Sequence, residues 1–155
     1  MLLLLPPSEG KAAEAGEQPS FRVGRPEDAA PVHGVLKRLA QLKPDERLKW
    51  YGVRQAEPAA AWHAHNLAAL DAPTLPAFAR YTGVVYQHLD APSLRAKKRL
   101  AQRVAVVSAL FGLVPADAPL PRYKLPINTW LARYWQPINT GRLARLARRQ
   151  PVIDL

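Results

Sequence analysis

Short apolar runs alternate with prolines and polar stretches along this chain, and their lengths predict both strands and helices. The first run, Leu2–Leu5, is closed by two prolines, and the last, residues 152–155, follows Pro151. Four residues are too few for a stable helix, so both runs favour short buried strands. We expect these strands to share one small sheet in an otherwise mostly helical α+β domain.

Helical spacing of apolar residues dominates the middle of the chain. Apolar residues recur every three or four positions over residues 32–40, and weaker helical patterns cover residues 44–51 and 59–70. Prolines stand at or before the start of the last two segments, where a helix tolerates them. The polar stretch 8–31 predicts a long loop, and the proline-rich stretch 115–126 predicts an irregular connection.

The longest helical pattern covers residues 93–112. It begins at Ser93, a good N-cap residue, and ends at Gly112, a natural C-terminal break. A helix, an apolar-Gly-apolar turn and a further element over residues 93–125 resemble a helix-hairpin-helix, in which backbone N–H groups of the turn meet a phosphate. A simple helix C-cap explains Gly112 equally well.

A tetrapeptide, Pro-Ile-Asn-Thr, occurs twice, at residues 126–129 and 137–140. In both copies Asn or Thr is placed to cap a following helix. A single recurrence is too little for a repeat architecture, so the pattern indicates repeated turn chemistry.

The composition bounds the class of protein. With 155 residues and 48% hydrophobic residues, the chain is expected to form a single domain, residues 1–155. The absence of cysteine excludes disulfides, thiol chemistry and the common zinc frameworks, and it fits a reducing compartment. The first apolar run is too short for a secretory signal, and no stretch approaches the ~20 apolar residues of a membrane span. We expect a cytoplasmic, monomeric protein.

The charge is distributed unevenly. Residues 1–90 contain ten Lys/Arg and ten Asp/Glu, whereas residues 91–155 contain twelve Lys/Arg against only Asp117 and Asp154. The formal net charge of +10 therefore comes entirely from the C-terminal part. Such a field attracts polyanions, although a solvated basic face without a partner is the alternative interpretation.

The basic residues fall on the faces of two predicted helices. One set follows helical spacing on the 93–112 segment, and another follows it on the last helix; they are Arg95, Lys98, Arg99 and Arg103, then Arg142, Arg145 and Arg149. Neither helix contains an Asp or Glu that would neutralise its basic face. Phosphate binding compensates for this repulsion because it releases counterions, so we expect both sets to contact a nucleic-acid backbone.

Three further residues carry candidate binding chemistry. Arg122 and Lys124 flank Tyr123, a pattern that suits a phosphate track or base stacking, with an inward-packed tyrosine as the alternative. Lys11 follows the first strand and a Pro-Pro-Ser-Glu-Gly turn, where a cation and open N–H groups can hold a phosphate. The Walker pattern fails because residue 5 is not glycine.

Several blocks of the sequence resemble the YaaA peroxide stress family. They are residues 4–11 (LLPPSEGK), residues 108–114 (SALFGLV), residues 121–125 (PRYKL), Tyr134-Trp135 and the closing VIDL, in the family's order. The resemblance covers the whole chain. It implies a cytoplasmic α/β protein with a helix-hairpin-helix, DNA binding, and protection when peroxide and free iron damage DNA. Family members continue beyond the last strand, so we expect an incomplete N-terminal part of a longer domain.

These observations favour a non-enzymatic protein that binds double-stranded or distorted DNA through its backbone, without sequence specificity, cofactor, metal or membrane. The four histidines show no metal-ligand spacing. One alternative is a DNA- or nucleotide-processing enzyme of the glycosylase or lyase kind, with Asp117 as catalyst; a turn-forming Asp is the simpler interpretation of that residue. Another alternative is a module that binds an acidic protein.

Overall fold

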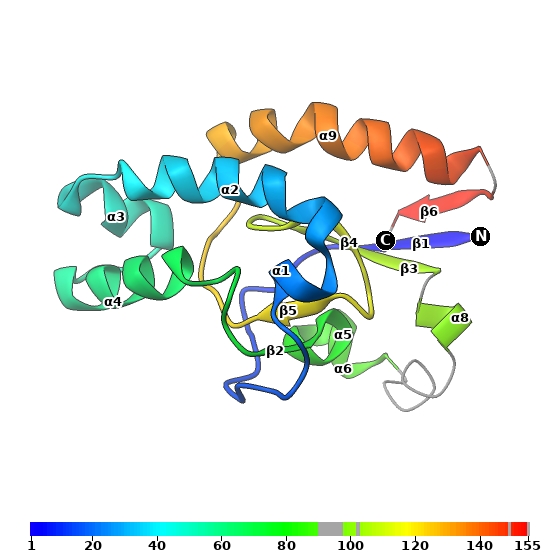
Figure 1. Cartoon of the computed structure of the whole chain (residues 1–155), viewed down its shortest axis with the longest axis horizontal. Helices are drawn as coiled ribbons and strands as arrows, with labels where there is room; N and C mark the ends of the chain where they lie inside the picture. The colour runs from blue at the N-terminus through cyan, green and yellow to red at the C-terminus, as the bar shows by residue number, and fades with distance from the viewer. Residues whose placement is uncertain (90–97, 102, 149, 155) are drawn as a thin grey trace.

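Four short strands form a mixed sheet that joins the beginning, the middle and the end of the chain (Figure 1). The structure is a computed structural model, and it describes residues 1–89, 98–101, 103–148 and 150–154. In the order β4-β3-β1-β6, the strands are Gly112–Pro115, Val104–Ser108, Leu2–Leu5 and Val152–Asp154. β1 is parallel to both of its neighbours, and β3 pairs with β4 in an antiparallel hairpin.

The central position of β1 explains its sequence. Leu3 pairs with Val104 of β3 on one side and with Ile153 of β6 on the other. A strand covered on both faces is expected to be a continuous apolar run, and Leu2–Leu5 is one. The predicted strands are thereby confirmed in one sheet, and the α+β class is confirmed with them.

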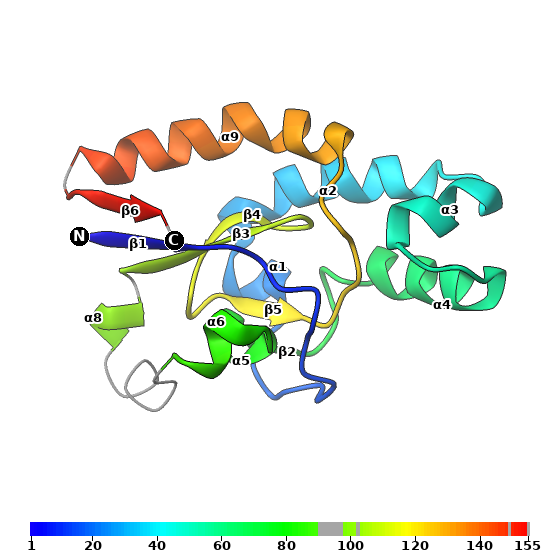
Figure 2. The ribbon, with the colours of Figure 1, turned by 180° about the vertical axis from the view of Figure 1, so that it is seen from behind.

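Helices cover this sheet and extend away from it (Figures 1 and 2). The longest, α9 (Thr129–Ala147), lies above the sheet in both views, beside α2 (Pro26–Ala40). The remaining helices are α1 Phe21–Gly24, α3 Pro44–Tyr51, α4 Ala56–Leu67, α5 Ala77–Arg80, α6 Val84–Gln87 and α8 Lys98–Ala101. A second, two-stranded sheet pairs β2 (Thr74–Pro76) with β5 (Pro119–Pro121).

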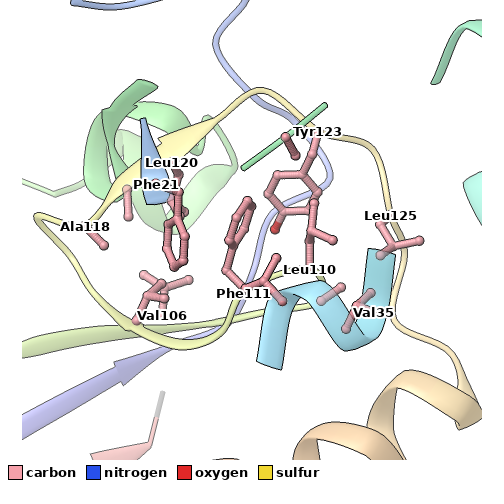
Figure 3. Close-up of a cluster of buried hydrophobic side chains, with 14 of the residues drawn as sticks. Phe21, Val35, Val106, Leu110, Phe111, Ala118, Leu120, Tyr123 and Leu125 are labelled. Carbon is pink, nitrogen blue, oxygen red and sulfur yellow. The ribbon is translucent and has the colours of Figure 1, made fainter. Parts of the chain in front are cut away.

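The main core lies between the two sheets and α2 (Figure 3). Phe111, in the turn of the β3–β4 hairpin, packs against Phe21 at 4.5 Å between ring centroids and against Tyr123 at 5.5 Å. All three rings are almost completely buried. Tyr123 lies in the loop after β5, so its ring connects the core to that loop. The candidate site lies at this loop.

The predicted helix over 93–112 is wrong for most of its length. Among the described residues of that segment, only Lys98–Ala101 is helical, and Val104–Ser108 and Gly112–Pro115 are strands. Residues 93–97 and 102 lie outside the described residues. The segment VAVVS is rich in β-branched residues, and pairing with β1 and β4 satisfies its backbone, so the strand prevails over the helical spacing.

The helix-hairpin-helix-like element expected over residues 93–125 is wrong for the same reason, because strands β3, β4 and β5 occupy that segment. Gly112 begins a strand instead of ending a helix. Its φ of 69° is left-handed, and a Cβ there would lie 2.6 Å from the Trp135 ring. Glycine is required at this position for both conformation and space.

Two further expectations need correction. The predicted loop 8–31 contains α1 and the start of α2, whose Pro26 lies in the first turn, where the missing N–H is not needed. The Pro-Ile-Asn-Thr repeat behaves differently in its two copies. Asn128 caps α9 by accepting from the Leu131 N–H at 2.9 Å, as predicted, whereas Asn139 lies inside α9 and accepts from the Leu113 N–H of β4 at 2.9 Å.

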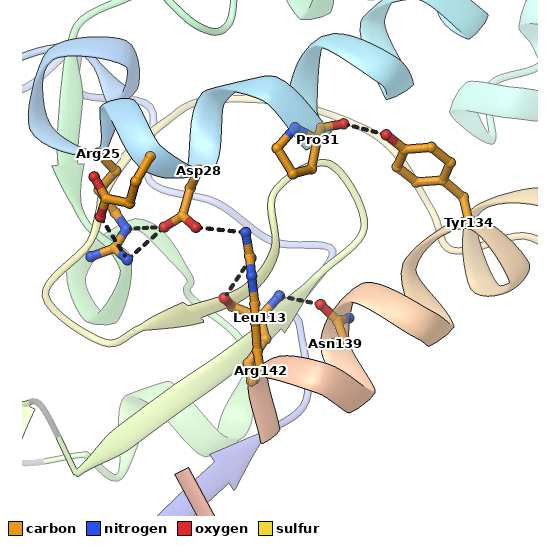
Figure 4. A network of polar contacts seen from close by, with 8 residues as sticks. Arg25, Asp28, Pro31, Leu113, Tyr134, Asn139 and Arg142 are labelled. Atoms are coloured by element: carbon orange, nitrogen blue, oxygen red, sulfur yellow. Dashed lines mark hydrogen bonds and ion pairs between the residues drawn. The ribbon is translucent and has the colours of Figure 1, made fainter. Parts of the chain in front are cut away.

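A polar network fastens α9 to α2 and β4 (Figure 4). Asp28 of α2, whose side chain is 10% exposed, accepts from Arg142 of α9 at 2.5 Å and from the Arg25 Nε at 2.6 Å. Arg142 also donates to the Leu113 carbonyl at 3.2 Å, and Tyr134 donates to the Pro31 carbonyl at 2.7 Å. We call this network the Asp28 clamp. It pairs Arg142, one of the predicted phosphate-binding arginines, with a carboxylate of the protein itself.

Candidate functional site

A cavity of about 220 Å³ lies where the loop after β1 meets the loop that leads from β5 to α9. In Figure 2 these two segments, one blue and one yellow to orange, run side by side. The cavity is lined by residues 7–9, Lys11, Ala109 and residues 123–127. Three sequence blocks, 4–11, 108–114 and 121–125, therefore meet at one place, and we call it the Lys11 cavity.

The amine of Lys11 is held by neutral groups. Its Nζ donates to the Ser8 carbonyl at 2.9 Å and to the Glu9 carbonyl at 3.4 Å. It lies 4.3 Å from the centroid of the Tyr123 ring and 5.4 Å from that of Tyr81. Aromatic faces and carbonyl oxygens attract a cation without cancelling its charge.

Burial and neighbouring cations make this ammonium less stable than usual. Burial lowers the pKa of Lys11 to about 8, and the positive charge of Lys124 contributes next. Glu9 opposes the shift of that pKa, and Arg80 adds to it. At neutral pH roughly a tenth of the Lys11 amine is therefore unprotonated, far more than for an ordinary lysine.

A chain of buried hydroxyl groups fixes the ring beneath Lys11. The Tyr123 hydroxyl lies 2.7 Å from the Tyr81 hydroxyl and 2.8 Å from the Ser108 Oγ. Ser108 in turn accepts from the Phe111 N–H at 3.0 Å, which ties the chain to the β3–β4 turn. Burial raises the pKa of Tyr81 and of Tyr123, so both hydroxyls stay neutral at physiological pH.

Arg80, at the end of α5, organises the loop that follows Lys11. Its side chain is fully buried. The guanidinium donates only to backbone carbonyls: to Leu120 at 3.0 Å, Ala12 at 2.7 Å, Glu14 at 2.8 Å and Ala15 at 3.2 Å. Burial lowers the pKa of Arg80, but an arginine remains charged at any physiological pH. Arg80 therefore adds a positive charge that acts on Lys11 and helps to lower its pKa.

Helix α4 positions the other two cations of this region. The Asn66 amide donates to the Lys124 carbonyl at 2.8 Å and accepts from the Lys124 N–H at 3.1 Å. The Arg122 guanidinium lies over the Trp62 ring at 5.0 Å, and His65 Nε2 donates to the Arg122 carbonyl at 2.8 Å. Within the described part of the chain, no carboxylate forms an ion pair with Lys11, Arg122 or Lys124.

The remaining predicted binding residues do not gather on one surface. Arg142 belongs to the Asp28 clamp, whereas Arg145 is exposed beside it and lines a second cavity of about 300 Å³. Lys98 and Arg99 belong to α8, which lies below the sheet in both views while α9 lies above it (Figures 1 and 2).

Of the last four predicted binding residues, two lie in the described part of the chain. Arg103 is exposed in the turn before β3. Gly112 is buried under Trp135. Arg95 and Arg149 lie outside the described residues.

The alternative catalyst Asp117 lies in the turn between β4 and β5 and does not line the Lys11 cavity. In the residues that the structure describes, no group of three or more His, Cys, Asp or Glu side chains is arranged to hold a metal ion. None of the helices in the described part of the chain has the length and apolar character to cross a membrane.

Several residues of the site were not predicted from the sequence: Arg80, Tyr81, Ser108 and Asn66. Arg80 carries a recognisable signal, because a lone arginine within the apolar stretch 77–81 has to be paired once it is buried. Ser108 lies in one of the blocks that resemble the YaaA family. Asn66 carries no signal, since its partners at Lys124 lie 58 positions away.

Comparison with known proteins matches the whole chain to one family. A family model described as "Peroxide stress protein YaaA" matches residues 1–155. A UPF0246 protein of Corynebacterium glutamicum is 36% identical over 152 residues, which are 96% of this chain and 58% of that protein. A UPF0246 protein of Streptomyces coelicolor is 35% identical over 166 residues, covering all of this chain and 64% of that protein. The chain thus spans about three fifths of the length of these relatives.

Proposed function

The chain belongs to the YaaA peroxide stress family, and from that premise we propose that it binds DNA. Lys11 and Lys124 hold backbone phosphates at the Lys11 cavity, and Arg122, which lies over Trp62 next to Tyr123, holds a phosphate beside it. The binding is governed by charge and shape, because two lysines and one carboxylate, Glu9, line the cavity and the lining offers no set of side chains for reading base edges.

The observation that carries the proposal is the kind of support these cations receive. Lys11 rests on carbonyl oxygens and tyrosine rings, Arg122 on an indole, and the Lys124 backbone on an amide. None of these partners neutralises the charge, and Arg80 adds another positive charge nearby. Such an arrangement is costly without a ligand and favours an anion with several negative oxygens, as a phosphate has.

Exposed arginines outside the cavity extend the positive field. Arg99, Arg103 and Arg145 are solvent-exposed, and they accelerate association with a polyanion even where they do not touch it. Arg142 has no such role, because Asp28 holds its guanidinium.

A salt series tests the proposal. Binding of the intact protein to a fluorescent DNA duplex is measured by anisotropy, with Lys124→Ala compared with Lys37→Ala, an exposed lysine on α2 that serves as the charge-matched control. Lys124→Ala should weaken binding roughly three- to tenfold and lower the salt slope by about one, whereas Lys37→Ala should change neither. A salt-independent affinity, or equal loss in both variants, contradicts phosphate binding at the cavity.

The acidic-protein alternative is tested in the same assay. If the natural partner is an acidic protein bound only through its charge, heparin and DNA should compete equally well for the same surface. Binding of such a partner should not depend on Lys124 more than on an exposed lysine elsewhere. Equal competition by heparin and by duplex at matched charge, with Lys124→Ala and Lys37→Ala behaving alike, would favour that alternative.

A further inference from the structure

We propose that Lys11 is a covalent nucleophile, whose amine condenses with an aldehyde carried by a phosphate-bearing molecule at the Lys11 cavity. In DNA such an aldehyde is the ring-opened sugar of an abasic site. This inference rests on the proposed function only for the capture of the phosphate, and the covalent step is a separate property of Lys11.

The geometry leaves the amine ready for a ligand. An ammonium has three N–H donors, and two of those of Lys11 are directed to the Ser8 and Glu9 carbonyls. Within the described residues, no third acceptor lies within hydrogen-bond distance of Nζ. Lys11 lines the cavity together with Tyr123, whose ring centroid lies 4.3 Å from Nζ, so we expect a molecule held there to reach the amine.

The surroundings also favour the reactive, neutral form. Desolvation and an adjacent cation are the two devices that activate lysines for imine chemistry, and both act on Lys11. Around the amine, Lys124 and Arg80 favour the neutral form and Glu9 opposes it. Tyr81 and Tyr123 stay uncharged because burial raises the pKa of each.

Neighbouring residues select the class of substrate. Lys124 lines the cavity together with Lys11, and once Lys11 is neutral the charge of Lys124 is left to bind a phosphate. A cavity of about 220 Å³ has room for a sugar with a phosphate. The ligand is therefore an aldehyde with a phosphate close to it, which describes both an abasic nucleotide and a free sugar phosphate.

The step balances without an oxidant or a metal. The ammonium first releases one proton to solvent. The lone pair of the neutral amine then attacks the aldehyde carbon, and the π electrons of the C=O bond move to oxygen. Both amine protons leave with that oxygen as water, and a C=N bond joins Nζ to the sugar. Hydride from added borohydride reduces this imine to a stable secondary amine.

Trapping with cyanoborohydride tests the inference on the intact protein. It is run at protein concentrations that saturate binding, with a duplex containing one abasic site and, in a second arm, with free 2-deoxyribose 5-phosphate. We expect a covalent adduct whose peptide map places the modification on Lys11. Adduct with the duplex alone identifies DNA as the source of the aldehyde, whereas adduct in both arms at equal rates identifies the sugar phosphate; either supports the chemistry.

Variants and pH sharpen the result. Lys11→Arg keeps a positive charge but cannot form an imine, and we expect trapping to fall at least about tenfold, while Lys37→Arg traps like the parent. The yield should rise with pH as Lys11 deprotonates around pH 8. The peptide map is made on the adduct of the parent protein. It therefore shows whether Lys11 is the modified residue even if the Lys11→Arg variant fails to fold.

The inference is overturned if the adduct maps to the amino terminus or to other lysines, if Lys11→Arg traps as well as the parent, or if no adduct forms. The proposed function is checked separately, with a duplex carrying a reduced abasic site that has no aldehyde. Salt-dependent binding to that duplex without any trapping removes the covalent step alone. Loss of binding as well removes the proposed function.

Discussion

The Lys11 cavity and the Asp28 clamp use the same residue types in opposite ways. At the clamp, Arg25 and Arg142 share the buried carboxylate of Asp28, which offsets their charge and joins α2 to α9. At and beside the cavity, the Lys11 amine lies against carbonyls and tyrosine rings, the Arg122 guanidinium lies over an indole ring, and the Asn66 amide holds only the backbone of Lys124. Their charges stay available. The comparison teaches that the partner of a cation, and not its position in a basic stretch, separates a structural role from a binding role.

The largest expected effect comes from the buried cation that supports the cavity. Arg80→Ala leaves four backbone carbonyls without their donor and opens a void, so the free energy of unfolding should fall by about 3–5 kcal/mol. Urea denaturation measures this. Arg54→Ala, at an exposed position, is the control and should change stability by less than about 0.5 kcal/mol. A small effect of Arg80→Ala would show that the loop after Lys11 is held by other contacts.

The clamp provides the next effect. Arg142→Gln leaves Asp28 with only Arg25, and we expect a loss of about 2–4 kcal/mol in stability, with little change in the salt dependence of DNA binding by the folded fraction. Arg122→Gln should have the opposite pair of effects. The free energy of unfolding should stay the same, and the slope of log affinity for DNA against log salt concentration should fall by about one. If the two variants gave the same pair of results, the distinction between the two regions would fail.

The smallest effect concerns the electrostatic coupling within the cavity. The charge of Lys124 lowers the pKa of Lys11, so Lys124→Ala should raise that pKa from about 8, by less than about one unit. Competitive labelling of Lys11 with an amine reagent over a pH series gives the midpoint directly. Lys37→Ala should leave the midpoint unchanged, and a lowered midpoint in Lys124→Ala would contradict the assignment.

The sequence predicted the parts of the fold that depend on short-range pattern. The strand Leu2–Leu5 is confirmed because a four-residue apolar run closed by two prolines has few alternatives, and the helix Pro44–Tyr51 is confirmed at its predicted bounds. Residues 104–112 were mispredicted because their apolar positions fit a helical period as well as a strand. Pairing with β1, a hundred residues earlier, decides between the two, and local spacing carries no trace of it.

The candidate site was predicted only in pieces. Lys11, Arg122 and Lys124 were each identified, but nothing in their spacing shows that the segments carrying them meet in one cavity. The pairing of Arg142 with Asp28 was equally invisible, because 114 positions separate the two residues. Counting charge along the chain therefore overestimated the helical arginines and underestimated the lysine next to the first strand.

The central place of β1 in its sheet has a consequence for the order of events during synthesis. Leu2–Leu5 leaves the ribosome before both strands that it pairs with, because one of them begins at Val104 and the other at Val152. At a translation rate of about 5–20 residues per second, the second edge of β1 waits roughly 8–30 s for its partner. Throughout that interval at least one edge of an apolar strand has an unpaired backbone, so we expect the nascent chain to be prone to pairing with other chains until β6 is made.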